Sequence, residues 1–268
     1  MQIKMIATDL DGTLLRGSDV FSAYASDYSL DVLKRCRAEG VKVVYATGRD
    51  DGAKVPAISE IVDGYASNNG ARAYIGCELV YERTFSTESV RGLLVAADGA
   101  GIKIAIVSGG VFYGNFNDPQ SWNWQWPSAC ENSDFNTFEA DADFLFAYVN
   151  STEESATAKR IIIERLPKEL RLSVREDGFL FIVLHNEATK SRGVAALAER
   201  WGIMPSEIAA FGNDMIDVDL LEYCGVGVAV SNATDDLKRV ADFICGSNEN
   251  DGVAKWIEEH ILKTITDK

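Results

Sequence analysis

The sequence lacks the features of a disulfide-stapled, secreted or membrane-spanning protein. Its five cysteines are odd in number and scattered, without a C-x-x-C pair or a metal-ligand spacing. Such usage is typical of reduced thiols, and we expect a cytoplasmic protein. No apolar run reaches the roughly eighteen residues of a transmembrane helix. The nearest, residues 101–111, is short and contains Lys103. The N-terminus enters a strand pattern directly, without the charged region and cleavage site of a secretory signal.

Positive charge is also scarce. The 26 lysines and arginines stand against 41 aspartates and glutamates, which leaves a net charge of −15. Nucleic-acid partners need basic patches, so this balance argues against them. An anionic substrate would have to be attracted locally, by a metal ion and a few placed cations. A hydrophobic content of 47% over 268 residues suffices for a sizeable core, in one large domain or two modest ones.

Strand and helix patterns alternate at both ends of the chain, without internal repeats. Strands are predicted at 3–7, 41–46, 64–67, 208–211, 226–230 and 243–244, and helices at 29–39, 191–201, 216–223, 233–240 and 252–262. Such alternation is typical of an α/β fold with a parallel sheet flanked by helices. We therefore expect one core domain built from both ends, residues 1–82 and 188–268.

The middle of the chain has a different character. Hairpins are predicted at 72–85 and 170–184, strands at 103–107 and 144–149, and helices at 87–97 and 153–166. We expect a sheet-rich domain, residues 83–187, inserted between the halves of the core. Its segment 112–138 is rich in aromatic residues, and Trp122, Trp124 and Trp126 alternate there. Such tryptophans belong to a core or an interface more often than to a substrate pocket.

Polar residues occur at four points where the core strands end or a helix begins. These are Asp9 and Asp11, Thr47-Gly48-Arg49, Lys190 at a helix start, and Asn213 with Asp214 and Asp217. In open α/β sheets ligands bind beyond the carboxyl ends of the strands, so these groups predict one site. The two neighbouring aspartates repel each other when buried, and a divalent cation such as Mg²⁺ would offset that repulsion.

The residue types suit phosphoryl transfer. A carboxylate such as Asp9 can attack phosphorus and form an aspartyl-phosphate. Asp11, two residues on, projects to the same side and can protonate the leaving oxygen and then deprotonate water. Lys190 can hold phosphate as a point charge, while Thr47 and the Gly48 amide can bind phosphoryl oxygens. The segment 213–217 supplies the oxygen ligands that Mg²⁺ prefers.

Four stretches resemble the motifs of the haloacid dehalogenase-like hydrolase superfamily: DLDGTLL (9–15), TGR (47–49), a lysine that opens a helix, and FGNDMIDVDLLEYCGVGVAVSNA (211–233). Two further stretches, SNNGA (67–71) and NDGVA (250–254), resemble the Cof-type subfamily of subclass IIB. The resemblance implies a Rossmann-like core with residues 83–187 as an inserted α/β cap of the C2 type. It also implies a Mg²⁺-dependent phosphatase that forms an aspartyl-phosphate and acts on a small phosphorylated metabolite.

The resemblance also implies roles residue by residue. The catalytic residues would be Asp9 and Asp11. The metal ligands would be Asp9, Asp11 through its main-chain oxygen, Asn213, Asp214 and Asp217, and the phosphate-binding residues Leu10, Thr47, Gly48 and Lys190. Arg49 and Asn69 are candidates for substrate binding. A surface salt bridge fits Arg49 equally, and a structural turn at the cap hinge is favoured for Asn69.

One segment departs from the family pattern Gly-Asp-x-x-Asn-Asp. This chain reads GNDMID (212–217), so Asn213 stands where a metal-binding aspartate is expected and Ile216 where an asparagine usually touches phosphate. A neutral carboxamide oxygen binds Mg²⁺ more weakly than a carboxylate does. We therefore expect the Mg²⁺ dependence to be shifted to higher concentration.

The leading function is hydrolysis of small cytosolic phosphomonoesters, with sugar phosphates first and phosphorylated cofactors after them. Two alternatives stay open: a catalytically weak ligand-sensing or scaffold protein on the same fold, which the altered segment 213–217 suggests, and a sugar phosphomutase. Nucleic-acid and membrane partners are not expected. His185 and His260 are expected to be structural.

Overall fold

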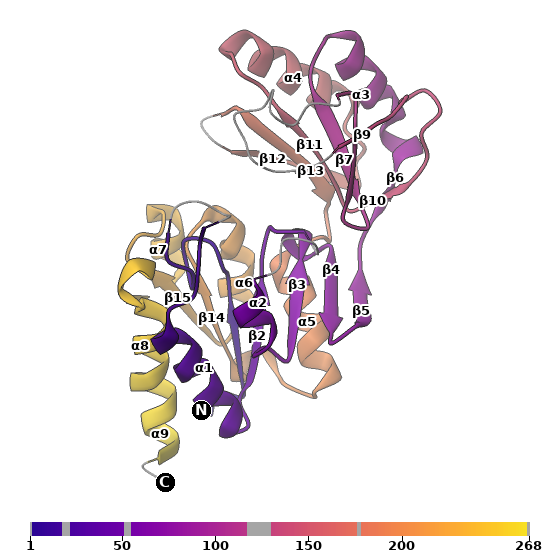
Figure 1. Ribbon diagram of the computed structural model, residues 1–268. Helices are drawn as coiled ribbons and strands as arrows, with labels where there is room; N and C mark the ends of the chain where they lie inside the picture. Colours follow the sequence, from indigo (N-terminus) through magenta and orange to yellow (C-terminus); the bar gives the residue numbers. More distant parts are fainter. Residues whose placement is uncertain (1, 18–21, 51–54, 117–129, 176–177, 267–268) are drawn as a thin grey trace. The chain divides into compact units, whose positions relative to one another are not determined.

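Two compact units make up the protein. The computed structural model describes residues 2–17, 22–50, 55–116, 130–175 and 178–266 (Figure 1). The core unit consists of Met1–Glu82 and Thr189–Lys268, and the inserted unit of Arg83–Ala188. The tryptophans at 122, 124 and 126 lie outside the described residues, so their role stays a prediction.

An eight-stranded sheet forms the centre of the core unit, with the strand order β16-β15-β14-β1-β2-β3-β4-β5. Its parallel strands are β1 (Met5–Thr8), β2 (Lys42–Ala46), β3 (Gly64–Ser67), β14 (Ile208–Gly212), β15 (Val226–Val230) and β16 (Phe243–Cys245), and the antiparallel strands β4 (Arg72–Ile75) and β5 (Glu78–Glu82) extend it. β1 pairs with β14 on one side and β2 on the other, and it is buried along its whole length. A strand buried on both faces favours an apolar run, which residues 5–7 supply.

Helices cover both faces of this sheet (Figure 1). α1 (Asp27–Ala38) packs against α8 (Gly252–Ile257), while α5 (Lys190–Arg200) packs against β2, β3 and β4 and against α6 (Val218–Tyr223). Gly193 lets α5 approach β3 closely, because a Cβ there would lie 2.7 Å from the Cβ of Ala66. Lys190, the first residue of α5, thereby reaches Asp9 at the end of β1.

Shorter elements complete the core unit. They are α2 (Pro56–Ser59), α7 (Asp235–Val240), α9 (Lys263–Thr266), the π-helical turn η7 (Glu258–Leu262) and the tight turns η1 (Asn68–Gly70), η4 (Pro205–Glu207), η5 (Met215–Asp217) and η6 (Asn248–Asn250). The segment predicted as a helix at 216–223 is therefore a tight turn followed by α6. The segment predicted as a helix at 252–262 is α8 continued by η7.

The inserted unit is a six-stranded sheet with the order β12-β13-β11-β7-β8-β9. Its strands are β7 (Ile104–Ser108), β8 (Val111–Gly114), β9 (Glu131–Asn132), β11 (Phe144–Tyr148), β12 (Leu170–Arg175) and β13 (Leu180–His185), and β6 (Phe85–Ser86) pairs separately with β10 (Asp141–Ala142). The helices α3 (Thr87–Gly99) and α4 (Thr152–Arg165) pack together and bury Leu93, Ile161 and Phe181 in a second apolar core (Figure 1).

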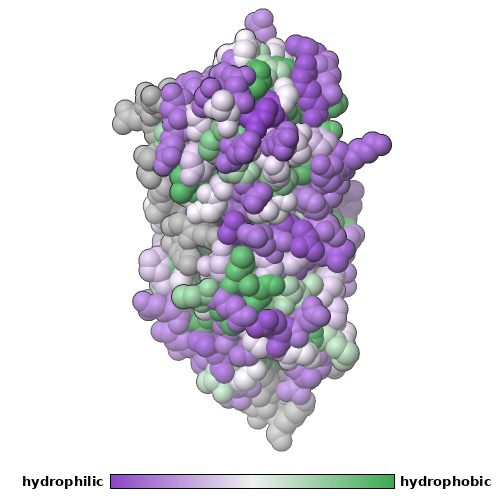
Figure 2. Space-filling model, turned by 90° about the vertical axis from the view of Figure 1, so that its right-hand side faces the viewer, coloured by the Kyte–Doolittle hydropathy of each residue, from purple (hydrophilic) through white to green (hydrophobic). Residues whose placement is uncertain are grey.

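The predicted α/β class with a parallel sheet is confirmed. The strands predicted at 64–67 and 226–230 match β3 and β15 to the residue. α1 begins at Asp27 rather than Ser29, because the hydroxyl of Ser26 caps it by accepting from the Ser29 amide at 3.1 Å. Among the described residues no helix is long and apolar enough to cross a membrane. Hydrophilic residues predominate on the face drawn in Figure 2.

Candidate active site

The DLDGT segment forms a tight turn at the carboxyl end of β1. The carbonyl of Leu10 accepts hydrogen bonds from the amides of residues 13, 14 and 15 at 3.2, 3.0 and 2.9 Å. Gly12 has a φ of +73°, and a Cβ at this position would collide with the Nδ2 of Asn213. Glycine is therefore required both for the turn and for the close approach of Asn213.

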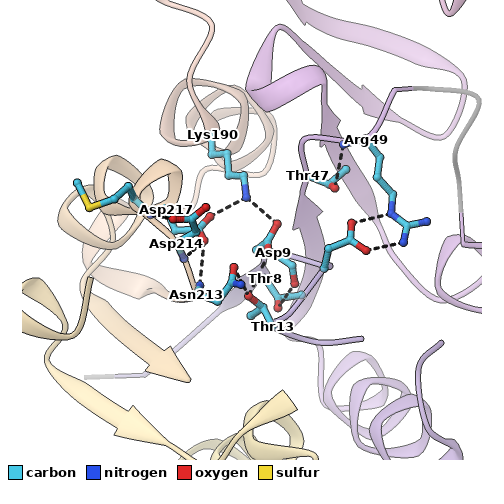
Figure 3. Close-up of polar contacts among 11 residues, drawn as sticks. Thr8, Asp9, Thr13, Thr47, Arg49, Lys190, Asn213, Asp214 and Asp217 are labelled. Atoms are coloured by element: carbon cyan, nitrogen blue, oxygen red, sulfur yellow. Dashed lines mark hydrogen bonds and ion pairs between the residues drawn. The ribbon is translucent and has the colours of Figure 1, made fainter. Parts of the chain in front are cut away.

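Three charged side chains meet beyond the ends of β1 and β14 (Figure 3). The Nζ of Lys190 donates to the Oδ1 of Asp9 and to the Oδ1 of Asp217, both at 2.6 Å. The side chain of Lys190 is 1% exposed and that of Asp217 is 0% exposed. Such shielding strengthens charge-assisted hydrogen bonds. One ammonium faces two carboxylates here, so this cluster carries an excess of negative charge.

Burial and this imbalance shift the pKa values of the cluster. Burial is the largest influence on Asp9, and with the charges of Asp217 and Asp11 it outweighs Lys190 and raises the pKa of Asp9 to about 7. Burial acts to lower the pKa of Lys190, but the charges of Asp217 and Asp9 outweigh it and raise that pKa. Lys190 therefore stays a cation, while full ionisation of Asp9 at neutral pH needs a further positive charge nearby.

Thr13 joins Asp9 to Asn213. Its Oγ1 lies 3.0 Å from the Oδ2 of Asp9 and 3.2 Å from the Oδ1 of Asn213. A carboxylate oxygen and a carboxamide oxygen thus approach the same hydroxyl. Sequence reasoning missed this contact of Thr13. The available signal was its position four residues after Asp9, on the far side of a turn made by Gly12.

The acidic residues after β14 brace their own loop. The Oδ2 of Asp217 accepts from the amides of Asn213 and Asp214 at 2.9 and 3.1 Å, while its Oδ1 accepts from Lys190. The carboxylate of Asp214 accepts from the Met215 amide at 2.6 Å and so caps η5. Asp217 therefore orients both the loop and Lys190, and the metal-binding roles of Asp214 and Asp217 stay predictions.

The loop after β2 is held against the turn after β3. The Oγ1 of Thr47 accepts from the Arg49 amide at 3.2 Å, and the Thr47 carbonyl accepts from the Asn69 amide at 2.9 Å. Gly48 lies beside the side chain of Asn69, where a Cβ on Gly48 would be 3.1 Å from the Oδ1. Asn69 is buried with a φ of 55°, which suits the expected structural turn. Its role toward a substrate stays a prediction.

Asp11 contacts a different cation from Asp9. The Nε of Arg49 donates to the Oδ2 of Asp11 at 2.7 Å, and its Nη2 donates to the Oδ1 at 2.5 Å. Arg49 is thus in a salt bridge, one of the two expectations for it, but at the site rather than on an open surface. Because each aspartate of DLDGT contacts a different cation, their mutual repulsion is reduced.

The donors around Asp9 suit Mg²⁺. This ion prefers oxygen ligands, and the Asp9 carboxylate and Asn213 carboxamide present such oxygens on either side of Thr13. The excess negative charge beside Lys190 also favours a divalent cation. No group of three or more His, Cys, Asp or Glu side chains in the described part of the chain is arranged to hold a metal. The oxygen of Asn213 and the main-chain oxygen of Asp11 would therefore have to complete the ligand set.

A second charged cluster surrounds Asp251. The Oδ1 of Asp251 accepts from the Nε of Arg16 at 3.0 Å, from the hydroxyl of Ser26 at 2.7 Å and from the hydroxyl of Ser29 at 3.2 Å. The Nη2 of Arg16 donates to the Oδ2. Burial acts to raise the pKa of Asp251, but these hydrogen bonds and the Arg16 charge outweigh it and lower the pKa. The cluster ties the NDGVA segment to the start of α1.

The chain belongs to the haloacid dehalogenase-like hydrolase family, whose model matches residues 6–257. Phosphatase YwpJ of Bacillus subtilis is 27% identical over 97% of this chain and 100% of its own. Phosphoglycolate phosphatase of Sulfolobus acidocaldarius is 22% identical over 99% of this chain and 100% of its own. The solved structure of the subclass IIB sugar phosphatase BT4131 shares the fold, with a TM-score of 0.78 at 22% identity over 96% of this chain and 98% of that chain. The protein is thus a Cof-type phosphatase, a phosphoric monoester hydrolase.

Proposed function

We propose that this phosphatase hydrolyses small phosphomonoesters, sugar phosphates first, with Mg²⁺ and through an aspartyl-phosphate on Asp9. The position of Asp9 carries the proposal, since its carboxylate at the end of β1 is held by Lys190 at 2.6 Å and by Thr13 at 3.0 Å. These contacts fix the direction of the carboxylate and leave it further lone pairs for attack. The names of the sugar phosphatase and the phosphoglycolate phosphatase support a small phosphorylated substrate.

The residues of the site can carry both halves of the reaction. First, an oxygen of Asp9 bonds to phosphorus, the bond from phosphorus to the leaving oxygen breaks, and Asp11 gives that oxygen its proton. Then Asp11 takes a proton from water, the water oxygen bonds to phosphorus, and the bond to Asp9 breaks to release inorganic phosphate. The amides of Leu10 and Gly48 and the side chains of Thr47 and Lys190 would bind the phosphoryl oxygens throughout.

Mg²⁺, when bound, would neutralise the negative charge that Asp9 and the phosphoryl group bring together. Asp9, Asn213 and the main-chain oxygen of Asp11 would hold it, with Asp214 and Asp217 as further candidates. Because the carboxamide of Asn213 is uncharged, half-maximal activity is expected at a higher Mg²⁺ concentration than an aspartate at this position would need.

Hydrolysis of p-nitrophenyl phosphate against a Mg²⁺ titration tests this function, with Asp9→Asn as the matched inactive variant. Turnover that depends on Mg²⁺ and vanishes in the variant is the expected result. A screen of sugar phosphates and phosphorylated cofactors would then identify the substrate. If neither the aryl phosphate nor any member of the screen is hydrolysed by the folded protein at any Mg²⁺ concentration, hydrolysis is contradicted. A ligand-sensing protein on this fold would then be favoured.

The inserted unit and the cysteines complete the proposal. Residues 83–187 would act as the cap that selects the leaving group and excludes bulk water.

All five cysteines are free, which suits action in the reducing cytoplasm.

A further inference from the structure

The side chain of Arg49 occupies both carboxylate oxygens of Asp11. The guanidinium meets the carboxylate side-on, through Nε at 2.7 Å and Nη2 at 2.5 Å. The side chain of Arg49 is 9% exposed and that of Asp11 34% exposed, so the cation is the more buried partner. Bidentate pairs of this kind are among the stronger contacts between protein side chains.

The backbones on both sides of this contact are fixed. The Arg49 amide donates to the Oγ1 of Thr47 at 3.2 Å, and the Arg49 carbonyl accepts from the Asn68 amide at 2.8 Å. Asp11 lies in the turn that the Leu10 carbonyl closes through the amides of residues 13–15. The contact therefore opens by rotation of side chains rather than by movement of the loops.

The contact weakens when Asp11 holds the proton that it gives to the leaving oxygen. A general acid or base needs an oxygen within hydrogen-bond reach of the leaving oxygen, and a protonated carboxyl has less acceptor capacity for a guanidinium than a carboxylate has. Two successive hydrogen bonds of about 2.8 Å place the Arg49 guanidinium within roughly 6 Å of the leaving oxygen. A group on the leaving group two to four atoms from the ester oxygen therefore comes within reach of Arg49.

We propose that Arg49 selects, among small phosphomonoesters such as sugar phosphates, those whose leaving group carries a second anionic group, a carboxylate or a phosphate, close to the scissile ester. Such a group can replace the Asp11 carboxylate as the acceptor of the two hydrogen bonds from the Arg49 guanidinium. Arg49 then keeps a bidentate partner, and Asp11 is free to act on the leaving oxygen. A neutral leaving group has no anion that could replace Asp11. Breaking the contact then separates the largely buried guanidinium of Arg49 from its carboxylate, which is unfavourable. This role rests on the proposed function, in which Asp11 is the acid and base.

Matched substrate pairs test the role of Arg49. Phosphoglycolate and ethyl phosphate differ by a carboxylate, and propane-1,3-diol bisphosphate and propyl phosphate differ by a second phosphate. The expected kcat/KM is at least tenfold higher for the anionic member of one pair or both, and the pair that shows it identifies the preferred anion. In Arg49→Gln this ratio should fall to within twofold of unity. Arg49→Lys keeps the positive charge without the bidentate geometry of a guanidinium, and it should recover part of the wild-type ratio.

Arg16→Gln is the matched control. It removes another side-on arginine–aspartate pair of the core unit, which joins Arg16 to Asp251. In this variant kcat/KM should change by the same factor for both members of each substrate pair, so the ratio of the two values stays as in the wild type. Ratios within twofold of unity for both pairs in the wild type, or an unchanged ratio in Arg49→Gln, would overturn the proposed selection.

Binding separates this inference from the proposed function. Dissociation constants for phosphoglycolate, propane-1,3-diol bisphosphate and their neutral partners are measured by calorimetry in Asp9→Asn, which cannot form the covalent intermediate. A second anionic group should tighten binding at least fivefold, and the double variant with Arg49→Gln should lose that gain. Equal binding within each pair contradicts the role of Arg49 even if hydrolysis is observed. A preserved preference supports it even if no ester is hydrolysed.

Discussion

Two of the charged clusters in the core unit are made from similar groups but balanced differently. In one, the ammonium of Lys190 is shared between Asp9 and Asp217. In the other, the single carboxylate of Asp251 faces one guanidinium and two hydroxyls. The consequences for the pKa values are opposite: that of Asp9 is raised to about 7, whereas that of Asp251 is lowered.

This difference separates a reactive site from a structural one. Around Asp251 the charges are paired within the protein, so ionisation of the carboxylate stabilises the fold. Around Asp9 one negative charge is left over when Asp9 is ionised, which favours a bound cation at a cost in stability, and that cation in turn favours the anionic phosphoryl group. Neutralising each aspartate should therefore have different effects on activity and stability.

The largest effect is expected for Asp9→Asn. Phosphatase activity should fall by more than about 10³-fold, because an amide cannot form the covalent bond to phosphorus. The melting temperature should not fall, since Lys190 keeps Asp217 as a balanced partner. Activity with p-nitrophenyl phosphate and thermal unfolding measure the two quantities. Retention of activity would show that Asp9 is not the nucleophile.

Removal of the shared cation tests the imbalance directly. Lys190→Met leaves two buried carboxylates without a cation and should lower the free energy of unfolding by about 3–5 kcal/mol in urea denaturation without Mg²⁺. The double variant with Asp217→Asn should recover much of that loss, because one of the two carboxylates is gone. A loss below about 1 kcal/mol in the single variant would show that the cluster is already neutral.

Asp251→Asn should reduce stability and leave the chemistry intact. The expected loss in the free energy of unfolding is about 1–2 kcal/mol, since Arg16 is partly exposed and water can solvate it in the variant. Activity per folded molecule should stay within twofold of the wild type. A greater loss of activity than of folded protein would place Asp251 in the active site.

The same variant gives the pH dependence. The pKa of Asp251 is lower in the folded state than its unfolded value of about 3.9. Its contribution to stability is therefore fully present above that value and is lost as the pH falls through the folded-state pKa. The stability difference between wild type and Asp251→Asn should be constant from pH 5 to 7 and should shrink below about pH 4. Urea denaturation at several pH values measures it, and a difference independent of pH would contradict the ion pair.

The smallest effect is expected for Asn213, the uncharged candidate metal ligand beside Asp9. Asn213→Asp should lower the Mg²⁺ concentration at half-maximal activity by about tenfold, because a carboxylate replaces a carboxamide. The Asn213→Ala variant is the control, and it should raise that concentration. An unchanged midpoint in both variants would show that residue 213 is not a metal ligand.

Much of this protein could be predicted from its sequence because the signals are local. Runs such as Val226–Val230 and the glycine after Asp11 determine strand and turn by themselves. A change in pattern, in which hairpins replace helix alternation, predicts an inserted domain at residues 83–187. The tight turn η5 could not be separated from α6, because an Asp214 cap and an ordinary helix start look alike in sequence.

The sequence alone determined the α/β class, the family and the residue types at the carboxyl ends of the strands, since these depend on short-range periodicity and motif order. Only the tertiary structure decided which cation each aspartate contacts. Asp9 meets Lys190, 181 residues away, and Asp11 meets Arg49, 38 residues away. Side-chain direction depends on neighbours that long-range packing brings together, and two aspartates one residue apart carry no local signal that distinguishes them.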